Sequence, residues 1–204
     1  MYSRMTKNVV ALFGSNLLGG NTDKLLMEAI RGVEDAGCTV QRINVARENL
    51  AGCSQIYSCM FEDRCSNEDG VNKYHTMLKE ADGLIIATPV MTYGIPGQLK
   101  SFMDRCQPFY MAKYFRKKSF ITKEHAIIRR TLFICIAGMN TPDVFIGPVL
   151  TTKAYCEIID AKYGDELLQN DMDTILKIEN KPDIMKAAYE KGRALGEAIA
   201  KARE

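Results

Sequence analysis

The chain has 204 residues, of which 47% are hydrophobic and 25% charged, and its formal net charge is +2. This composition suits one domain with a full core, and the small net charge gives no indication of a nucleic-acid partner. No apolar run approaches the ~20 residues that cross a bilayer, and residues 1–7 leave no room for a signal peptide. The seven cysteines then favour reduced thiols. We therefore expect a soluble cytoplasmic protein with no membrane or nucleic-acid partner.

The chain opens with a strand, a polar turn and a helix. Residues 9–13 are apolar, residues 14–22 are rich in Gly, Ser, Asn and Thr, and the apolar residues from 25 to 33 recur at helical spacing. The next segment, residues 38–45, alternates weakly, as a strand near the edge of a sheet does.

The later elements continue to alternate between strand and helix. In chain order we expect an irregular stretch over 46–70, a helix over 71–81, a strand over 83–88, a helix from about 99, a basic insertion over 110–130, a strand over 131–137, a helix over 143–162, a weaker strand over 166–170 and a helix from Pro182. Five strand–helix alternations predict an α/β fold, namely a doubly wound five-stranded parallel sheet with helices on both faces. We expect a single domain over 1–204.

Three polar loops follow the first, third and fourth strands, at 14–22, 88–97 and 138–142. In a parallel sheet of this kind, ligands bind outside the carboxyl ends of the strands, where these loops meet. The first loop places backbone N–H groups and hydroxyls at a helix N-terminus, which favours a phosphate. It lacks both the three-glycine dinucleotide pattern and the Gly-Lys-Ser/Thr end of a Walker loop. An ordinary strand-to-helix turn with Asn21 as N-cap is the alternative.

Two motifs carry a family resemblance. They are Gly-Ser-x-x-x-x-Gly-Asn-Thr at 14–22 and a Pro-Val loop that runs into Gln-Leu-Lys-x-Phe-x-Asp-Arg at 98–105. With them the sequence resembles the NADPH-dependent FMN reductase-like flavoproteins, nearest the iron–sulfur flavoprotein branch, over residues 8–106 by motif and beyond by element order. The resemblance implies a flavodoxin-like fold, bound FMN, NAD(P)H as electron donor, and a homodimer or homotetramer with the flavin near a subunit interface.

The resemblance also implies which residues bind the cofactor. Asn16 and Leu17 stand where Pro-Arg is frequent in the family, so a charge-assisted contact to the phosphate is lost and weaker FMN binding is expected. Met91 stands where an aromatic residue is common. The residues expected at the phosphate are Ser15, Asn16, Leu17, Asn21 and Thr22, and those expected along the isoalloxazine edge are Pro89, Val90, Met91, Thr92, Tyr93 and Gly94. Gly138 and Met139 of the third loop complete the predicted set.

The stretch over 46–70 holds three cysteines in an incomplete cluster motif. Relatives that bind a cluster carry four cysteines, and Cys53, Cys59 and Cys65 match the first, third and fourth of them, whereas Ile56 occupies the second position. A [4Fe–4S] cluster normally takes four thiolates, so we predict no ordinary four-cysteine cluster unless a remote cysteine such as Cys106 or an outside ligand substitutes. A remnant loop with buried free cysteines, a redox-sensing set and a site for another metal are the alternatives.

The sequence thus predicts an FMN-dependent oxidoreductase that accepts hydride from NAD(P)H and passes electrons to a quinone, flavin, metal complex or protein acceptor. The cofactor does the chemistry in such enzymes, and no catalytic acid, base or metal-ligand set is predicted. Two alternatives stay open: a non-enzymatic flavodoxin-like electron carrier, against which the mildly basic charge counts, and a cysteine-based redox sensor.

Overall fold

The computed structural model describes residues 7–201 and contains one five-stranded sheet in the order β2-β1-β3-β4-β5, with every neighbouring pair parallel. This is the flavodoxin-like order, so the predicted fold is confirmed. The start of the chain, on which the prediction of no signal peptide depends, lies outside the described residues. The strands are β1 (Asn8–Phe13), β2 (Thr39–Ile43), β3 (Gly83–Pro89), β4 (Arg130–Ile136) and β5 (Lys162–Gln169).

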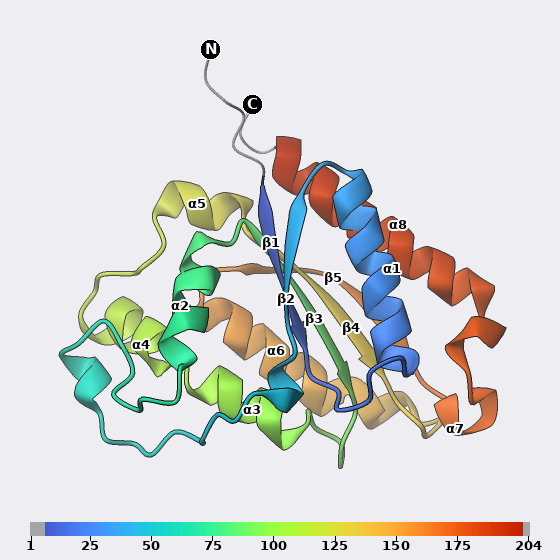
Figure 1. Ribbon diagram of the computed structural model, residues 1–204, viewed down its shortest axis with the longest axis horizontal. Coiled ribbons are helices and arrows are strands. Elements are labelled where there is room, and N and C mark those ends of the chain that lie inside the picture. The colour runs from blue at the N-terminus through green and yellow to red at the C-terminus, as the bar shows by residue number, and fades with distance from the viewer. Residues whose placement is uncertain (1–6, 202–204) are drawn as a thin grey trace.

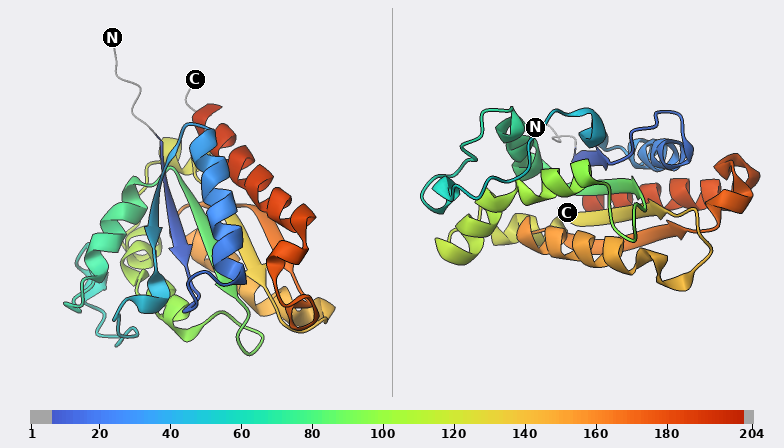
Figure 2. Two further views of the ribbon diagram at one scale, coloured as in Figure 1. Left: turned by 45° about the vertical axis from the view of Figure 1, so that its right-hand side comes forward. Right: turned by 90° about the horizontal axis from the view of Figure 1, so that it is seen from below.

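Helices cover both faces of the sheet (Figures 1 and 2). On one face α1 and α8 lie side by side, and on the other α2, α3 and α6 pack against the opposite side chains of the same strands. The α-helices are α1 (Asn21–Asp35), α2 (Val71–Glu80), α3 (Gly97–Asp104), α4 (Gln107–Tyr110), α5 (Lys123–Ile128), α6 (Ile146–Ile158), α7 (Met172–Ile175) and α8 (Pro182–Lys201). The short helices are η1 (Val45–Arg47), η2 (Ser58–Met60), the π-helix η3 (Met111–Phe115), η4 (Pro142–Phe145) and η5 (Ile178–Asn180).

The central strands explain why the sheet needs helices on both faces. In β3 the residues from Gly83 to Thr88 are all buried, which is typical of a parallel strand covered on two sides. The edge strand β2 instead alternates between exposed and partly buried residues, as its weak alternation predicted. Within residues 7–201, no helix combines the length and the apolarity that crossing a bilayer requires.

The last third of the chain differs most from expectation. Strand β5 begins at Lys162 rather than near 166, because its first residues lie exposed on the sheet edge around a bulge and give no apolar signal. The expected helix from 143 begins at Ile146, after the short η4. The basic insertion over 110–130 is largely helical, and two of its cations form ion pairs, Lys113 with Glu157 at 2.8 Å and Arg116 with Asp63 at 2.6 Å.

Candidate functional site

The three loops that the sequence singles out meet at the carboxyl edge of the sheet (Figure 1). The N–H of Gly14, just after β1, donates to the carbonyl of Ala87 in β3 at 2.8 Å. The N–H of Val90, just after β3, donates to the carbonyl of Ile136 at the end of β4 at 2.7 Å. The hydrogen bonds between neighbouring strands thus continue for one residue beyond β1 and β3, and they fix where the first two loops begin.

The first loop folds back on itself before α1. The hydroxyl of Ser15 accepts a hydrogen bond from the N–H of Leu17 at 3.2 Å, and the carboxylate of Asp23 accepts one from the N–H of Gly19 at 2.6 Å. Asp23 is held in turn by an ion pair with Arg42 at 2.7 Å. Gly19 has φ of +71°, a conformation that favours glycine and lets the chain turn into the helix. Asn16, Leu17 and Leu18 are exposed on the outside of this turn.

Helix α1 begins without a side-chain cap. Its N-cap is Gly20, which has no side chain to offer, so the alternative with Asn21 as N-cap is wrong. The first N–H groups of any α-helix lack partners within the helix, and here no capping side chain accepts from them. The N-terminus of α1 is therefore open to an outside acceptor, and Thr22 lies buried in its first turn.

Asn21 has a different role from the one expected. Its side-chain nitrogen donates to the carbonyl of Leu176 at 2.8 Å, and its side-chain oxygen accepts from the N–H of Ile178 at 3.0 Å. Both polar groups of the side chain are used to bind the segment after α7. The structure therefore brings Asn21 to the loop but commits its side chain to holding the fold. The α7 segment itself was missed in the sequence, because its few apolar residues show no clear period.

The second loop is a tight hairpin. Met91 and Gly94 exchange two backbone hydrogen bonds of 2.9 Å, and Thr92 and Tyr93 between them have φ of 49° and 58°. Positive φ at both central residues is the geometry of a type I′ turn, which usually takes Asn and Gly. Two non-glycine residues in this conformation store strain, which clusters at functional sites. Among the described residues, the N–H groups of Thr92 and Tyr93 have no acceptor, and both side chains are exposed.

The third loop is held by the segment that ties down Asn21. The N–H of Asp173 donates to the carbonyl of Gly138 at 3.1 Å, and the N–H of Asp171 donates to that of Met139 at 3.3 Å. The Met139 side chain is exposed. One short segment, 171–178, thus fixes both the third loop and the start of α1. The expected residues of all three loops lie on one edge, although Thr22 is buried and Asn21 is engaged.

These loops fit a flavin mononucleotide by the chemistry of their donors. An uncapped helix N-terminus favours a phosphate, and no Lys or Arg occurs in residues 14–22 to add a charge-assisted contact. The free N–H groups of Thr92 and Tyr93 are donors of the kind that the polar edge of an isoalloxazine ring requires. Exposed apolar side chains border the loops, Leu17 at 67% and Met91 at 58%.

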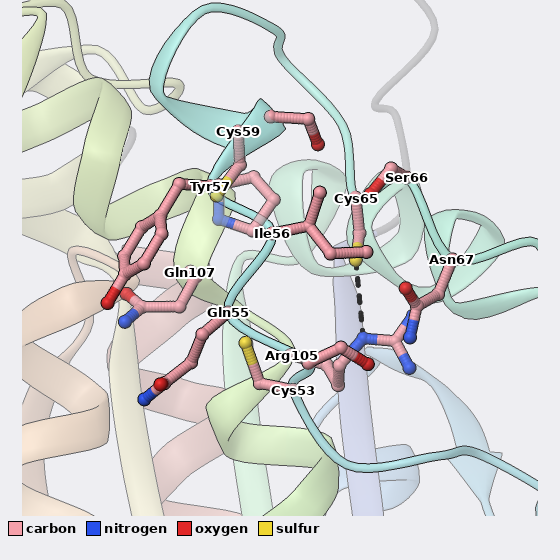
Figure 3. Close-up of a pocket in the computed structure, with 13 residues that line it drawn as sticks. Cys53, Gln55, Ile56, Tyr57, Cys59, Cys65, Ser66, Asn67, Arg105 and Gln107 are labelled. Atoms are coloured by element: carbon pink, nitrogen blue, oxygen red, sulfur yellow. Dashed lines mark hydrogen bonds between the residues drawn. The ribbon is translucent and has the colours of Figure 1, made fainter.

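The cysteine segment lies away from these loops, against the C-terminal end of α3. Cys53, Cys59 and Cys65 line one small pocket, and Ile56 lies between them (Figure 3). Burial, and then the neighbouring cysteines, raise the pKa of the Cys59 thiol. Among the residues that the structure describes, no three His, Cys, Asp or Glu side chains are placed to hold a single metal ion.

Protein contacts hold this segment in place. The side chain of Arg105 is fully buried and forms a two-pronged contact with the carboxylate of Asp69, at 2.6 and 2.9 Å. It also donates to the sulfur of Cys65 at 3.2 Å and to the carbonyl of Ala51 at 2.8 Å. The hydrogen bonds from Arg105 hold the pKa of Asp69 below its usual range. One buried arginine therefore ties the two ends of this segment, near residues 51 and 69, to the end of α3.

The pocket, as the structure has it, offers three thiolates. Ile56 takes the position of a second thiolate, and with its side chain in place the space enclosed between the three cysteines is about 20 Å³. The remote candidate Cys106 lies elsewhere: it is fully buried, and its sulfur lies 3.6 Å from the hydroxyl of Tyr155, in the core beneath α6. Burial raises the pKa of Cys106 to about 12.

Comparison with known proteins agrees with the motifs. The pattern of the NADPH-dependent FMN reductase family matches residues 7–130. An iron–sulfur flavoprotein of Methanocaldococcus jannaschii is 34% identical over 110 residues, which is 54% of this chain and 57% of the relative. The chain thus spans about half the length of the curated relatives it matches.

Solved structures share the fold across nearly the whole chain. An NAD(P)H:quinone oxidoreductase from Methanothermobacter marburgensis superimposes with a TM-score of 0.69 at 18% identity, covering 94% of this chain and 100% of that one. An FMN-dependent NADH-azoreductase from Bacillus anthracis, solved with FMN, gives 0.65 at 14% identity, covering 94% and 100%. The relatives that the chain matches include several iron–sulfur flavoproteins. Because the family pattern covers more than half of its residues, the chain belongs to the NADPH-dependent FMN reductase family.

Proposed function

We propose that this chain is a single FMN-binding domain and an NAD(P)H-dependent oxidoreductase, which passes electrons to a small-molecule or protein acceptor. One observation carries the proposal: an uncapped helix N-terminus and a strained hairpin with two free N–H groups share one edge of the sheet. FMN, when bound, would supply the hydride and electron chemistry. We propose no iron–sulfur cluster with four thiolates, because Ile56 takes the second position.

The chain's own residues would bind and orient the cofactor. The first N–H groups of α1, with the hydroxyls of Ser15 and Thr22, are the phosphate donors, and the rigid hairpin offers the N–H groups of Thr92 and Tyr93 to the ring edge. The hairpin resists displacement because the first turn of α6 packs on it: a Cβ at Gly147 would lie 2.2 Å from the carbonyl oxygen of Tyr93.

We also propose a homodimer or homotetramer that covers the loops. The exposed fractions of Ile146 and Leu150 on α6 are 55% and 62%, and Met91 and Tyr93 are exposed on the hairpin that the first turn of α6 packs against at Gly147. Exposed apolar side chains gathered on neighbouring elements are typical of an interaction site. The seven cysteines are free thiols, which suits the reducing cytoplasm.

The test is an absorption spectrum after FMN loading, followed by stopped-flow mixing with NADH and with NADPH. We expect one FMN per chain and direct bleaching of the flavin by at least one nicotinamide. A protein that takes up no FMN would contradict the proposal outright. A loaded protein that neither nicotinamide reduces would instead identify an electron carrier, and gel filtration in the same buffer would show the oligomer.

A further inference from the structure

A groove runs between α8 and the beginnings of β4 and β5, at the end of the sheet opposite the flavin loops. It encloses about 270 Å³ and is bordered by three cations, Arg130, Lys162 and Lys191, and one acid, Asp165. A cavity of this size accommodates a small organic molecule. No feature of the proposed oxidoreductase uses it.

A bulge in the edge strand shapes the groove. Arg130 pairs with Lys162 across β4 and β5, and the register then shifts so that Leu132 pairs with Asp165, with Gly164 as the extra residue. Paired residues of neighbouring strands point to the same face of a sheet, so Arg130, Lys162 and Asp165 all lie on the α8 side. The bulge thus gathers their charges beneath one helix.

The charges in the groove are not balanced. Lys191 is neutralised, because its ammonium group contacts both oxygens of Asp165 at 2.8 Å. Arg130 and Lys162 have no carboxylate partner within residues 7–201. The Nε of Arg130 is moreover buried without a hydrogen-bond acceptor. A buried guanidinium donor without an acceptor is destabilising, so this atom points to an acceptor that comes from outside the chain.

The far wall of the groove is apolar. Leu132 and Leu195 are buried in this wall. The small side chains of Ala194 and Ala198, on α8, leave room for a ligand in front of it. A ligand that fills the groove would therefore need an anionic head for the two cations and an apolar body for this wall.

We propose that the groove binds a small amphipathic organic anion, with its carboxylate or phosphate head on Arg130 and Lys162 and its apolar body against Leu195 and Ala198. The site is independent of the flavin loops, which lie at the other end of the strands.

The test is a two-dimensional ¹H–¹⁵N NMR titration of the full, FMN-loaded chain with octanoate and, separately, with inorganic phosphate. We expect octanoate to give saturable shifts of the amides of Gly164, Asp165 and Ala194, and to bind more tightly than phosphate. R130Q and K162Q should each weaken octanoate binding about tenfold or more, as the loss of a charge-assisted contact does. K186Q is the matched control, since Lys186 lies on α8 outside the groove, and it should bind as the wild type does.

A second variant protects the test if R130Q fails to fold. A198L keeps every cation and fills the space beside the apolar wall of the groove. It should therefore abolish octanoate binding, while its NMR spectrum remains that of a folded protein. Unshifted groove amides at saturating octanoate would overturn the proposal. So would wild-type affinity in R130Q, or phosphate binding as tightly as octanoate, because each removes one of the two recognition elements.

Discussion

At the scale of single residues, Ile56 decides what the cysteine pocket can hold. The side chains of Cys53, Cys59 and Cys65 already line the pocket, and Ile56 lies between them at the one position that lacks a thiol. We expect Ile56→Cys to take up about four irons per chain on anaerobic reconstitution with iron and sulfide, because it completes a four-thiolate ligand set and removes the isoleucine side chain that occupies the space between the cysteines. Iron and acid-labile sulfide analysis, with the visible spectrum, measures this.

The control is Ser54→Cys, which adds a fourth thiol to the wall of the same pocket at the wrong position. It should remain as poor in iron as the wild type. A wild-type chain that assembles a full cluster under these conditions would show that Ile56 is no obstacle.

Arg105 gives a second prediction at this scale. Its fully buried guanidinium is paired with Asp69, and it holds Cys65 and Ala51 as well. Arg105→Gln leaves the carboxylate without its cation, and breaking a buried pair in this way costs about 3–5 kcal/mol. Since Asp69 retains some exposure, we expect the lower end of that range, with faster cleavage of the 46–70 loop by limited proteolysis. Unchanged urea denaturation would contradict this prediction.

Single residues also show where sequence reasoning stops. The sequence placed Ser15, Thr22 and the hairpin residues in loops that the fold does bring to one edge, because the order of strands and turns is local information. The hydrogen bonds of the Asn21 side chain to the segment after α7 could not be predicted. Its two partners belong to a segment more than 150 positions later, and no local pattern records such a contact.

At the scale of elements, the free N-terminus of α1 predicts two opposite effects of one substitution. Gly20→Asp supplies a capping carboxylate and should stabilise the flavin-free protein by about 0.5 kcal/mol. A new Cβ there would lie 2.9 Å from the Leu17 side chain, which can move aside, and 3.2 Å from the Leu17 carbonyl oxygen, a tight contact that limits the gain. The same carboxylate should weaken FMN binding about tenfold, since it repels the phosphate at the helix end. Urea denaturation and fluorescence titration with FMN measure the two effects.

Gly20→Asn separates capping from charge. It should cap the helix about as well, while it weakens FMN binding far less. Equal losses of affinity in the two variants would argue that the phosphate does not bind at this helix end.

The contact between α1 and α8 predicts a stability effect. A Cβ at Gly192 would lie 2.0 Å from the carbonyl oxygen of Ala29, and one at Gly32 would lie 2.1 Å from that of Tyr189. The two helix backbones therefore touch through glycines. Gly192→Ala should cost about 3 kcal/mol in the free energy of unfolding, since a backbone atom cannot move aside as a side chain does. Gly97→Ala, where a Cβ meets open space, is the control and should be close to neutral.

Most elements were predictable because apolar periodicity marks them, as in β3 and α8. The segment 171–178 and the π-helix η3 were not, because each is too short to show a period. The start of β5 was missed because its first residues face solvent or the groove, so the hydrophobic pattern begins only at Leu167.

At the scale of the whole molecule, acid should weaken the fold through one histidine. His75 is buried in α2 with its ring against Phe109, and burial lowers its pKa to about 4 from 6.5. A base whose folded pKa is lowered is protonated first in the unfolded chain, so stability is lost as the pH falls from 6.5 toward 4. This site alone should remove about 2 kcal/mol between pH 7 and pH 5.

His75→Leu tests that expectation, since the variant has no proton to gain there. Its free energy of unfolding from urea titrations should fall less between pH 7 and pH 5 than that of the wild type. An equal fall in both proteins would assign the acid sensitivity to other groups.

The packing of α1 against α8 has a consequence for how the chain folds while it is being synthesised. The region that carries the family pattern ends at residue 130, yet α1 within it is covered by a helix from the last described residues. Until residues 182–201 have been synthesised, Leu25, Ala29 and Val33 have no complete partner surface. Residues 7–130, which the family pattern matches, therefore lack the helix that covers α1, and we expect that they do not fold by themselves. During translation, one face of the sheet therefore stays partly uncovered, and open to aggregation, until α8 has been synthesised.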